Sequence, residues 1–332
     1  MLRLVFMGAD AIALPALNWL AGAGGEVAEV VAVFTQPDRP VGRGQQVQAN
    51  AIKQWALARH LPLSQPEKIG PAEREDLAAL QPDLTLVMAY GHILRSDFLA
   101  TPRLGTWNLH TSILPAYRGA SPIPTAITCG ETQTGVSLMR LVPQLDAGPV
   151  ADVERVSIDP LDTASEVEGK LAQACVPLLT RVLLRLVAGT QTSTEQDASQ
   201  ATFCRKLEKT DGRLDFSAPA ATLAARINGL MPWPGCAVTI NGQVVKLGRA
   251  DVCHIIDDKP PEGGTVLGTD AEGLLVGTGR GTLRLRKLQR PGGRMLPAAE
   301  FLRGFPVAPG TRLASQAMPA LVARTPFLRP KV

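Results

Sequence analysis

Short apolar runs alternate with amphipathic stretches from the N-terminus to about residue 160. The apolar runs have the length and the turn-bounded ends of buried strands, and they lie at residues 2–7, 30–34, 61–64, 83–89, 105–110, 134–141 and 150–158, the last as an edge strand. Residues with apolar side chains at helical spacing lie between them, at 12–20, 49–60, 72–80 and 122–129. This alternation favours an α/β fold with a doubly wound, mostly parallel, Rossmann-like sheet. Ligands of such sheets bind beyond the carboxyl ends of the strands.

The next helical pattern is long and is followed by a polar segment. Residues 163–187 carry apolar side chains along one face and predict a single amphipathic helix. The segment Gly189–Ser199 (GTQTSTEQDAS) consists of small and polar residues without periodicity. We therefore expect an α/β domain at residues 1–189, a linker at 190–204 and a second domain at 205–332.

The second domain has a different pattern. Short apolar runs separated by Asn-Gly, Gly-Gly and Glu-Gly turns predict strands at residues 237–240, 243–247, 264–267, 274–276 and 282–286. One helical pattern precedes them, at residues 219–230. Five short strands and one helix suit a small all-β barrel of the Greek-key kind, to which OB-like folds belong.

The composition excludes several protein classes. Hydrophobic residues make up 45% and charged residues 19% of the 332 positions, as in globular proteins, which argues against disorder, collagen and coiled coil. The sequence analysis finds neither a signal-peptide pattern nor a run long enough to cross a bilayer, so we expect a cytoplasmic protein with no membrane partner. The five cysteines and four histidines show no metal-ligand spacing, and we expect no metal.

Charge is distributed unevenly along the chain. Residues 1–204 contain 15 Lys and Arg against 20 Asp and Glu, and residues 205–332 contain 19 against 10, so the first part carries −5 and the second +9. A basic domain of this kind either binds a polyanion or presents a solvated basic face, and charge alone leaves both readings open.

Polar side chains end the predicted strand at 105–110. Alternation places Asn108 and His110 on one face, about 7 Å apart, beside a loop at the strand's carboxyl end. Both could instead satisfy buried backbone groups at a strand end. Asp146 could form a turn, or it could orient His110 and stabilise the imidazolium. Together the three supply an oxyanion donor, a proton-transfer group and its electrostatic partner, a set suited to acyl transfer onto an amine that the substrate brings.

Two basic segments suit contacts with phosphate. The loop Thr35–Gln46 is rich in Pro and Gly and carries Arg39 and Arg43, although a plain solvated connection explains it equally well. A run without an intervening acid contains Arg280, Arg284, Arg286, Lys287, Arg290 and Arg294. Because Arg284 and Arg286 alternate on one strand face, they suit a phosphate backbone, or they protect a sheet edge from pairing.

Three motifs then show a resemblance to a known family. The segments are Phe34–Gly44 (FTQPDRPVGRG), Asn108–Gly119 (NLHTSILPAYRG) and the stretch from Gly135-Val136 to Leu145–Gly148 (LDAG). In order and spacing they resemble the methionyl-tRNA formyltransferases, part of the wider group of 10-formyltetrahydrofolate-dependent formyltransferases. In the second domain, Arg205–Leu207 with Asp211-Gly212, and Pro232–Gly235 (PWPG), are similar to the C-terminal barrel of that family. Departures from the usual pattern occur at Gly8–Asp10, Thr111 and Phe203–Lys206.

The resemblance implies a reaction and a set of site residues. The reaction is transfer of the formyl group of 10-formyltetrahydrofolate to the α-amino group of methionyl initiator tRNA by a monomeric enzyme, with Asn108, His110 and Asp146 as catalytic residues. The folate would lie against Ser112, Ile113, Leu114, Pro115, Val87, Met88, Ala89 and Tyr90. The tRNA would contact Arg39, Arg43, Arg284, Arg286 and Lys287.

Three other functions remain as alternatives at this point. A formyltransferase acting on a small amine would need neither the 35–46 loop nor the basic domain. A catalytically silent RNA-binding module would have no use for Asn108, His110 and Asp146. A nicotinamide-dependent oxidoreductase is disfavoured because Gly8–Pro15 is not a GxGxxG fingerprint.

Overall fold

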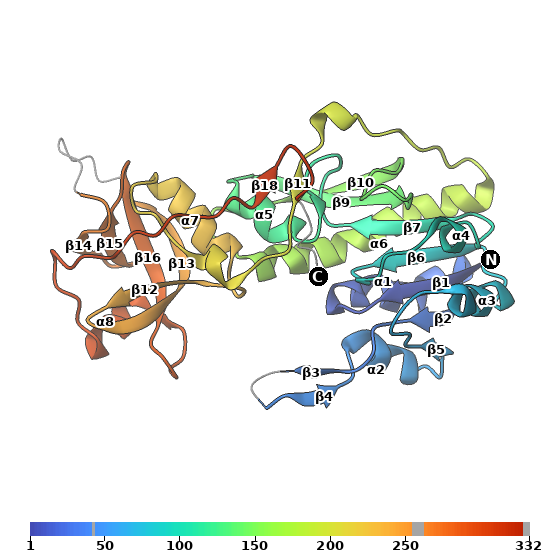
Figure 1. Ribbon diagram of the computed structural model, residues 1–332, viewed down its shortest axis with the longest axis horizontal. Helices are drawn as coiled ribbons and strands as arrows, with labels where there is room; N and C mark the ends of the chain where they lie inside the picture. Colours follow the sequence, from blue (N-terminus) through green and yellow to red (C-terminus); the bar gives the residue numbers. More distant parts are fainter. Residues whose placement is uncertain (42–43, 254–261, 328–332) are drawn as a thin grey trace. The chain divides into compact units, whose positions relative to one another are not determined.

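The structure is a computed structural model that describes residues 1–41, 44–253 and 262–327 (Figure 1). Its packing divides the chain into two compact units. Unit 1 comprises Met1–Arg118, Gly135–Val156 and Gly169–Ala201, and unit 2 comprises Gly119–Thr134, Ser157–Glu168 and Thr202–Val332.

Unit 1 is built on a seven-stranded sheet. In spatial order the strands are β10 (Val150–Ser157), β9 (Gln133–Arg140), β7 (Thr106–His110), β6 (Leu84–Met88), β1 (Leu2–Gly8), β2 (Ala28–Phe34) and β5 (Leu63–Ser64). From β7 to β5 all neighbours are parallel, and β9 pairs with β7 in the antiparallel sense. The predicted doubly wound, mostly parallel sheet is therefore confirmed, with β10 at its edge. Strand β6 illustrates why the prediction succeeded. All of its side chains are buried, as expected for a central parallel strand that is covered on both faces.

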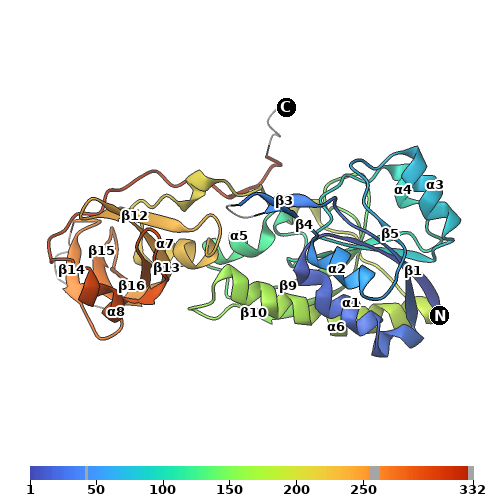
Figure 2. The ribbon, with the colours of Figure 1, turned by 90° about the horizontal axis from the view of Figure 1, so that it is seen from below.

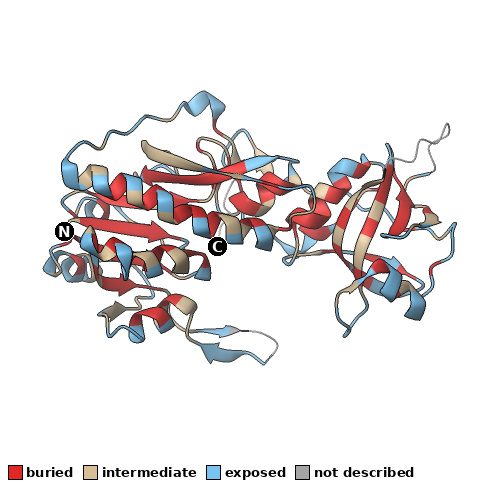
Figure 3. Ribbon diagram, turned by 180° about the vertical axis from the view of Figure 1, so that it is seen from behind, coloured by how far each residue is buried: buried red, intermediate tan, exposed pale blue. Residues whose placement is uncertain are grey.

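Helices connect these strands. They are α1 (Leu14–Leu20), α2 (Ala51–Leu57), α3 (Pro71–Ala79), α4 (Ser96–Leu99) and α6 (Ala164–Ala188), with 3₁₀ turns at Ala11–Ala13, Ala23–Glu26 and Ala198–Gln200. The predicted long helix is α6, and Figure 3 shows buried and exposed residues alternating along it. Its buried positions include Val167, Leu171 and Leu178, on the predicted apolar face.

The length and composition of α6 correct one expectation from the sequence. In the described part of the chain, α6 is the one helix long and apolar enough to cross a bilayer by those two criteria alone, whereas the sequence analysis found no such segment. The helix of a packed core meets the same two criteria, because one of its faces must be apolar.

The segment predicted as a loop at 35–46 contains regular structure. Strands β3 (Arg39–Val41) and β4 (Gln46–Gln48) pair antiparallel, with Arg39 opposite Gln48 and Pro40 opposite Val47. Figures 1 and 2 both show this ribbon beside α2. The sequence pattern does not predict these two strands, because neither of them has an apolar face. Residues 42 and 43 lie outside the described residues.

Unit 2 contains an antiparallel sheet with the strand path β12 (Cys236–Ile240), β13 (Gln243–Cys253), β16 (Thr282–Gln289), β15 (Leu274–Gly277) and β14 (Val266–Thr269), and with β17 (Leu296–Pro297) paired to β16. The β12–β13 hairpin turns through Asn241 and Gly242, both at positive φ, as a two-residue loop that follows the strand twist requires. The prediction of a small β domain of the OB-like barrel kind is thus confirmed as an antiparallel, strand-rich domain.

Helices and short strands complete unit 2. The helices are α5 (Pro122–Thr128), α7 (Ala220–Gly229) and α8 (Ala298–Gly304), with a 3₁₀ turn at Lys209–Gly212. The short strands β11 (Phe203–Cys204) and β18 (Val322–Ala323) pair with each other. Strand β8 (Arg118–Gly119) spans the boundary between unit 1 and unit 2 in the sequence. The core gathers side chains from α7, α8 and the sheet.

The observed division differs from the single boundary predicted near residue 205. Two segments of the predicted first domain belong to unit 2 because they pack there. α5 lies so close to α7 that a Cβ at Gly229 would touch Thr128, and the carboxylate of Glu166 pairs with Arg249 at 2.5 Å. Residues 190–201 of the predicted linker belong to unit 1. Contacts between segments distant in the sequence decide to which unit each segment belongs. The composition of a segment does not reveal these contacts.

Candidate active site

Two parallel strands end at one edge of the sheet in unit 1. Val87 of β6 pairs with Asn108 of β7, so the segment Val87–Tyr90 and the end of β7 lie side by side. This is the edge at which doubly wound sheets bind ligands. The structure therefore brings together the two predicted parts of the site, the polar end of β7 and the end of β6.

His110 is buried and each of its ring nitrogens faces an oxygen. The residue is 6% exposed, its Nε2 lies 3.0 Å from the carbonyl oxygen of Tyr117, and its Nδ1 lies 3.8 Å from Oδ2 of Asp146. A carbonyl oxygen can only accept a hydrogen bond, so Nε2 carries a proton in this arrangement. In the neutral ring the lone pair is then on Nδ1, on the side of the Asp146 carboxylate. A proton taken up there would form an imidazolium next to a negative charge.

Asn108 lies on the same face of β7, as the alternation predicted. Its backbone is held between Val87 of β6 and Met139 of β9, while its side chain is only partly buried. Among the described residues, no hydrogen-bond partner of its carboxamide is present. An amide N–H fixed on a rigid strand without a partner suits a donor to a developing oxyanion.

Asp146 lies in a turn that the backbone forces close to β9. The residue has a φ of 46°, which is uncommon for a residue with a side chain, and a Cβ at Gly148 would collide with the carbonyl oxygen of Arg140. The amide of Arg140 in turn donates to the carbonyl oxygen of Pro149 at 2.9 Å. The turn reading and the catalytic reading of this acid are therefore compatible, because the turn is what directs the carboxylate to His110.

The loop after β7 is fixed by two serines. Ser112 donates to the carbonyl oxygen of Ala116 at 2.6 Å. Ser137 of β9 donates to the carbonyl oxygen of Ser112 at 2.7 Å and accepts from the amide of Leu114 at 3.1 Å. The sequence analysis selected Ser112–Pro115 but not Ser137, since a serine in an apolar strand carries no local signal of which loop it will bind.

The end of β6 carries the other predicted folate contacts. Tyr90 is 2% exposed, burial raises the pKa of its hydroxyl, and that hydroxyl has no hydrogen-bond partner among the described residues. Ala89 has a φ of 48°. Gln36 donates through its side-chain amide to the carbonyl oxygen of Tyr90 at 2.9 Å. The segment after β6 is thus tied to the segment that leads into β3.

The predicted tRNA contacts in unit 1 fall on the β3–β4 ribbon. Arg39 is exposed, and its guanidinium lies 3.3 Å from the carboxylate of Glu67, an exposed pair of the kind that contributes little to stability. Arg43 lies outside the described residues.

In unit 2, Arg284 and Arg286 are surrounded by acids that the sequence does not place near them. Asp251 accepts from Nη2 of Arg284 at 2.8 Å and from Nη2 of Arg286 at 2.7 Å. Asp270 and Glu272 complete the cluster, at 2.9 Å and 2.5 Å from Nη1 of Arg284. Burial of the Asp251 carboxyl raises its pKa, but the hydrogen bonds from the two arginines outweigh burial and leave that pKa below its ordinary value.

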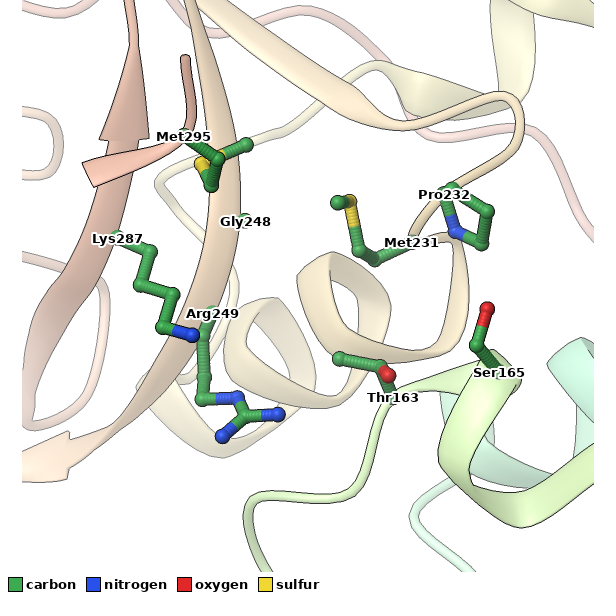
Figure 4. A pocket seen from close by; sticks show the side chains of 8 residues that line it. All are labelled: Thr163, Ser165, Met231, Pro232, Gly248, Arg249, Lys287 and Met295. Atoms are coloured by element: carbon green, nitrogen blue, oxygen red, sulfur yellow. The ribbon is translucent and has the colours of Figure 1, made fainter. Parts of the chain in front are cut away.

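Lys287 has a different environment from its two neighbours. With Arg249, Met231 and Met295 it lines a hollow of about 180 Å³ in unit 2, and Figure 4 shows the Lys287 side chain reaching toward the start of the Arg249 side chain, whose guanidinium points away. Among the described residues no carboxylate pairs with Lys287, whereas Arg249 is paired with Glu166. Of the three predicted basic residues in unit 2, Lys287 is the one whose charge the described structure leaves uncompensated.

The sequence was compared with known proteins. It matches the formyl transferase family over residues 3–183 and the formyl transferase C-terminal domain over residues 206–306. The methionyl-tRNA formyltransferase of Methylococcus capsulatus is 41% identical over 315 residues, which cover 95% of this chain and 100% of that protein. That of Burkholderia pseudomallei is 40% identical over 323 residues, covering 94% and 97%.

A comparison of structures gives the same fold. The N-formyltransferase from Helicobacter canadensis, in complex with folinic acid and dTDP-3-aminofucose, superimposes with a TM-score of 0.64 and 17% identity, covering 86% of this chain and 99% of that one. At this identity the similarity concerns the fold alone. No group of His, Cys, Asp or Glu that could hold a metal ion is found within the described ranges.

The acid cluster of unit 2 predicts a pH-dependent loss of stability. We expect Asp251→Asn to lower the free energy of unfolding at pH 7 by about 1–3 kcal/mol, because two partly buried guanidinium groups lose a charged acceptor. Since the folded-state pKa of Asp251 is lowered, its contribution is complete above the unfolded pKa of about 3.9 and is lost as the pH falls through the lower folded value. Urea unfolding of both proteins should show a gap that closes below about pH 4, and a gap of constant size down to pH 2 would contradict this assignment.

Proposed function

The chain belongs to the methionyl-tRNA formyltransferase family, and on this premise we propose that it transfers the formyl group of 10-formyltetrahydrofolate to the α-amino group of methionyl initiator tRNA. The product is N-formylmethionyl-tRNA for translation initiation. The observation that carries the proposal is the arrangement of Asn108, His110 and Asp146 at the carboxyl edge of the sheet, with the His110 and Asp146 side chains 3.8 Å apart. We place the enzyme in the cytoplasm and treat it as a monomer.

The amine of the substrate is the nucleophile. It attacks the formyl carbon and forms a new C–N bond, and the formyl oxygen becomes negatively charged in the tetrahedral intermediate. The Asn108 carboxamide donates to this oxygen, a contact worth on the order of 3 kcal/mol by comparison with other oxyanion donors. The intermediate then collapses by breaking the bond between the formyl carbon and the folate nitrogen.

His110 moves the proton that this exchange requires. The lone pair on Nδ1 accepts a proton from the attacking amine, because Nε2 is already engaged with the Tyr117 carbonyl oxygen. Asp146 compensates the imidazolium charge. The ring then returns the proton to the departing folate nitrogen, so that the amine loses one proton and tetrahydrofolate gains it.

The folate contacts follow from the same edge of the sheet. We assign them to the loop Ser112–Pro115 and to Val87–Tyr90. The first is fixed by Ser137 and the second by Gln36. Both segments present backbone at the end of a buried strand, where a flat ligand can approach closely.

The tRNA contacts are proposed for Arg39 and Arg43 in unit 1 and for Lys287, Arg284 and Arg286 in unit 2. Lys287 is the strongest of these, because its ammonium has no carboxylate partner among the described residues. Arg284 and Arg286 would have to exchange a carboxylate for a phosphate. Arg39 would exchange only an exposed pair with Glu67.

A single-turnover assay tests the function directly. Methionyl initiator tRNA, unacylated tRNA and a small amine such as glycinamide ribonucleotide are offered with 10-formyltetrahydrofolate. We expect rapid formylation of methionyl-tRNA alone. If the small amine were formylated and methionyl-tRNA were not, the proposed formyl transfer would stand, but the assignment of methionyl-tRNA as the acceptor would be overturned.

His110→Ala tests the proposed proton transfer. We expect kcat to fall by about 10²–10⁴-fold, the usual contribution of a positioned acid or base, with little change in folate affinity. The thermal unfolding temperature provides the control for folding. An unchanged kcat in a folded variant would remove His110 from the mechanism.

Lys287→Ala tests the proposed tRNA contact. We expect KM for methionyl-tRNA to rise about five- to tenfold with kcat and KM for folate unchanged, and the salt dependence of tRNA binding to lose about one ion. Arg286→Gln is a comparison within the same proposed set. Because Asp251 and Glu272 hold that guanidinium, we expect it to raise KM for methionyl-tRNA less than Lys287→Ala does and to lower stability more. Equal tRNA affinities for wild type and Lys287→Ala would contradict the contact.

A further inference from the structure

The polar segment predicted as a linker forms part of unit 1. Val150 and Thr194 exchange two backbone hydrogen bonds of 2.9 Å, so the segment lies along the start of β10. This places the side chain of Gln196, two residues further on, beside the turn that carries Asp146.

Gln196 uses both ends of its amide. Its nitrogen Nε2 donates to the carbonyl oxygen of Asp146 at 2.9 Å and to that of Gly148 at 2.7 Å. Its oxygen Oε1 accepts from Nε and Nη2 of Arg118, at 3.1 Å and 2.7 Å. Each hydrogen of the amide nitrogen has an acceptor, and the oxygen has two donors, so the group is fully satisfied.

The turn therefore has a support on each side. On one side, β9 approaches so closely that only glycine fits at position 148. On the other side, the Gln196 amide holds the carbonyl oxygens of Asp146 itself and of Gly148. The positive φ of Asp146 is a conformation that needs such support, because residues with side chains rarely adopt it alone.

Arg118 gives the same contact an electrostatic effect. Its side chain is buried at 6% exposure, and the negative charge of Asp146 offsets part of the decrease that burial causes in the pKa of the guanidinium. Gln196 thus fixes a buried positive charge near the carboxylate that faces His110.

From these contacts we propose that Gln196 is a positioning residue for formyl transfer, which holds the Asp146 turn at the distance from His110 that the reaction requires. The inference rests on the proposed function. It assigns the segment 190–201 a role in the reaction that is exerted through the Asp146 turn.

Three variants test the amide contacts. Gln196→Met keeps the length of the side chain and removes all four hydrogen bonds, and Gln196→Glu keeps an acceptor for Arg118 but removes both donors to the turn. Because a shift of about 1 Å in a catalytic group can cost on the order of 10²-fold, we expect both to lower kcat by about 10–100-fold with KM values for folate and tRNA near those of wild type. Gln200→Ala, at an exposed position of the same segment, is the control and should leave kcat unchanged.

A double-mutant cycle separates positioning from general support of the fold. If Gln196 acts through Asp146, then Gln196→Met should lower kcat by less than about twofold in an Asp146→Asn background, although it lowers kcat at least tenfold alone. Losses that multiply in the double variant would overturn the proposal, as would wild-type kcat for Gln196→Glu. An Asp146→Asn enzyme with wild-type kcat would instead remove Asp146 from the mechanism, and the positioning role with it.

Discussion

The parallel pairing of β6 with β7 is the constraint on which the rest of the site depends. The carboxyl ends of two adjacent parallel strands lie at the same edge of the sheet. At that edge the backbone leaves the buried sheet, so polar side chains can be accommodated there. Asn108 and His110 lie on one face because β7 is extended, and β9 holds the strand from the other side. A strand that is hydrogen-bonded on both sides has little conformational freedom. It therefore fixes the positions of two side chains more firmly than a loop would.

Hydrogen bonds to buried polar groups at this edge set much of the geometry of the site. The Tyr117 carbonyl oxygen fixes which nitrogen of His110 carries a proton. Ser137 ties the loop after β7 to β9. Gln196 does the same for the Asp146 turn. The Ser137 and Gln196 contacts join segments far apart in the sequence, and each of the three contacts removes a degree of freedom from a group of the candidate site.

In unit 2 the net charge of the sequence differs from the positive charge that is left without an acidic partner to bind a ligand. The sequence of residues 205–332 carries an excess of nine positive charges. Two of its arginines are nonetheless compensated by Asp251, Asp270 and Glu272, which come from other strands and turns of the same sheet. Lys287, which has no carboxylate partner in the part of the chain that the structure describes, lies one residue further along the same strand. The pattern of basic residues therefore gives the sign of the electrostatic potential, while the location of phosphate contacts depends on which charges have a partner.

The sequence by itself determined the seven strands of the main sheet and the long helix α6, the doubly wound sheet, the β-strand-rich second domain and the shared face of Asn108 and His110. These follow from periodicity, which is a local property of the chain. The tertiary structure alone decided the β3–β4 ribbon, the membership of residues 119–134 and 157–168 in unit 2, the ion pairs of Arg284 and the contacts of Ser137 and Gln196. The β3–β4 ribbon pairs neighbouring segments that carry no apolar pattern. In the other cases the contact partner comes from a segment distant in sequence, and only the closure of the fold brings the two together.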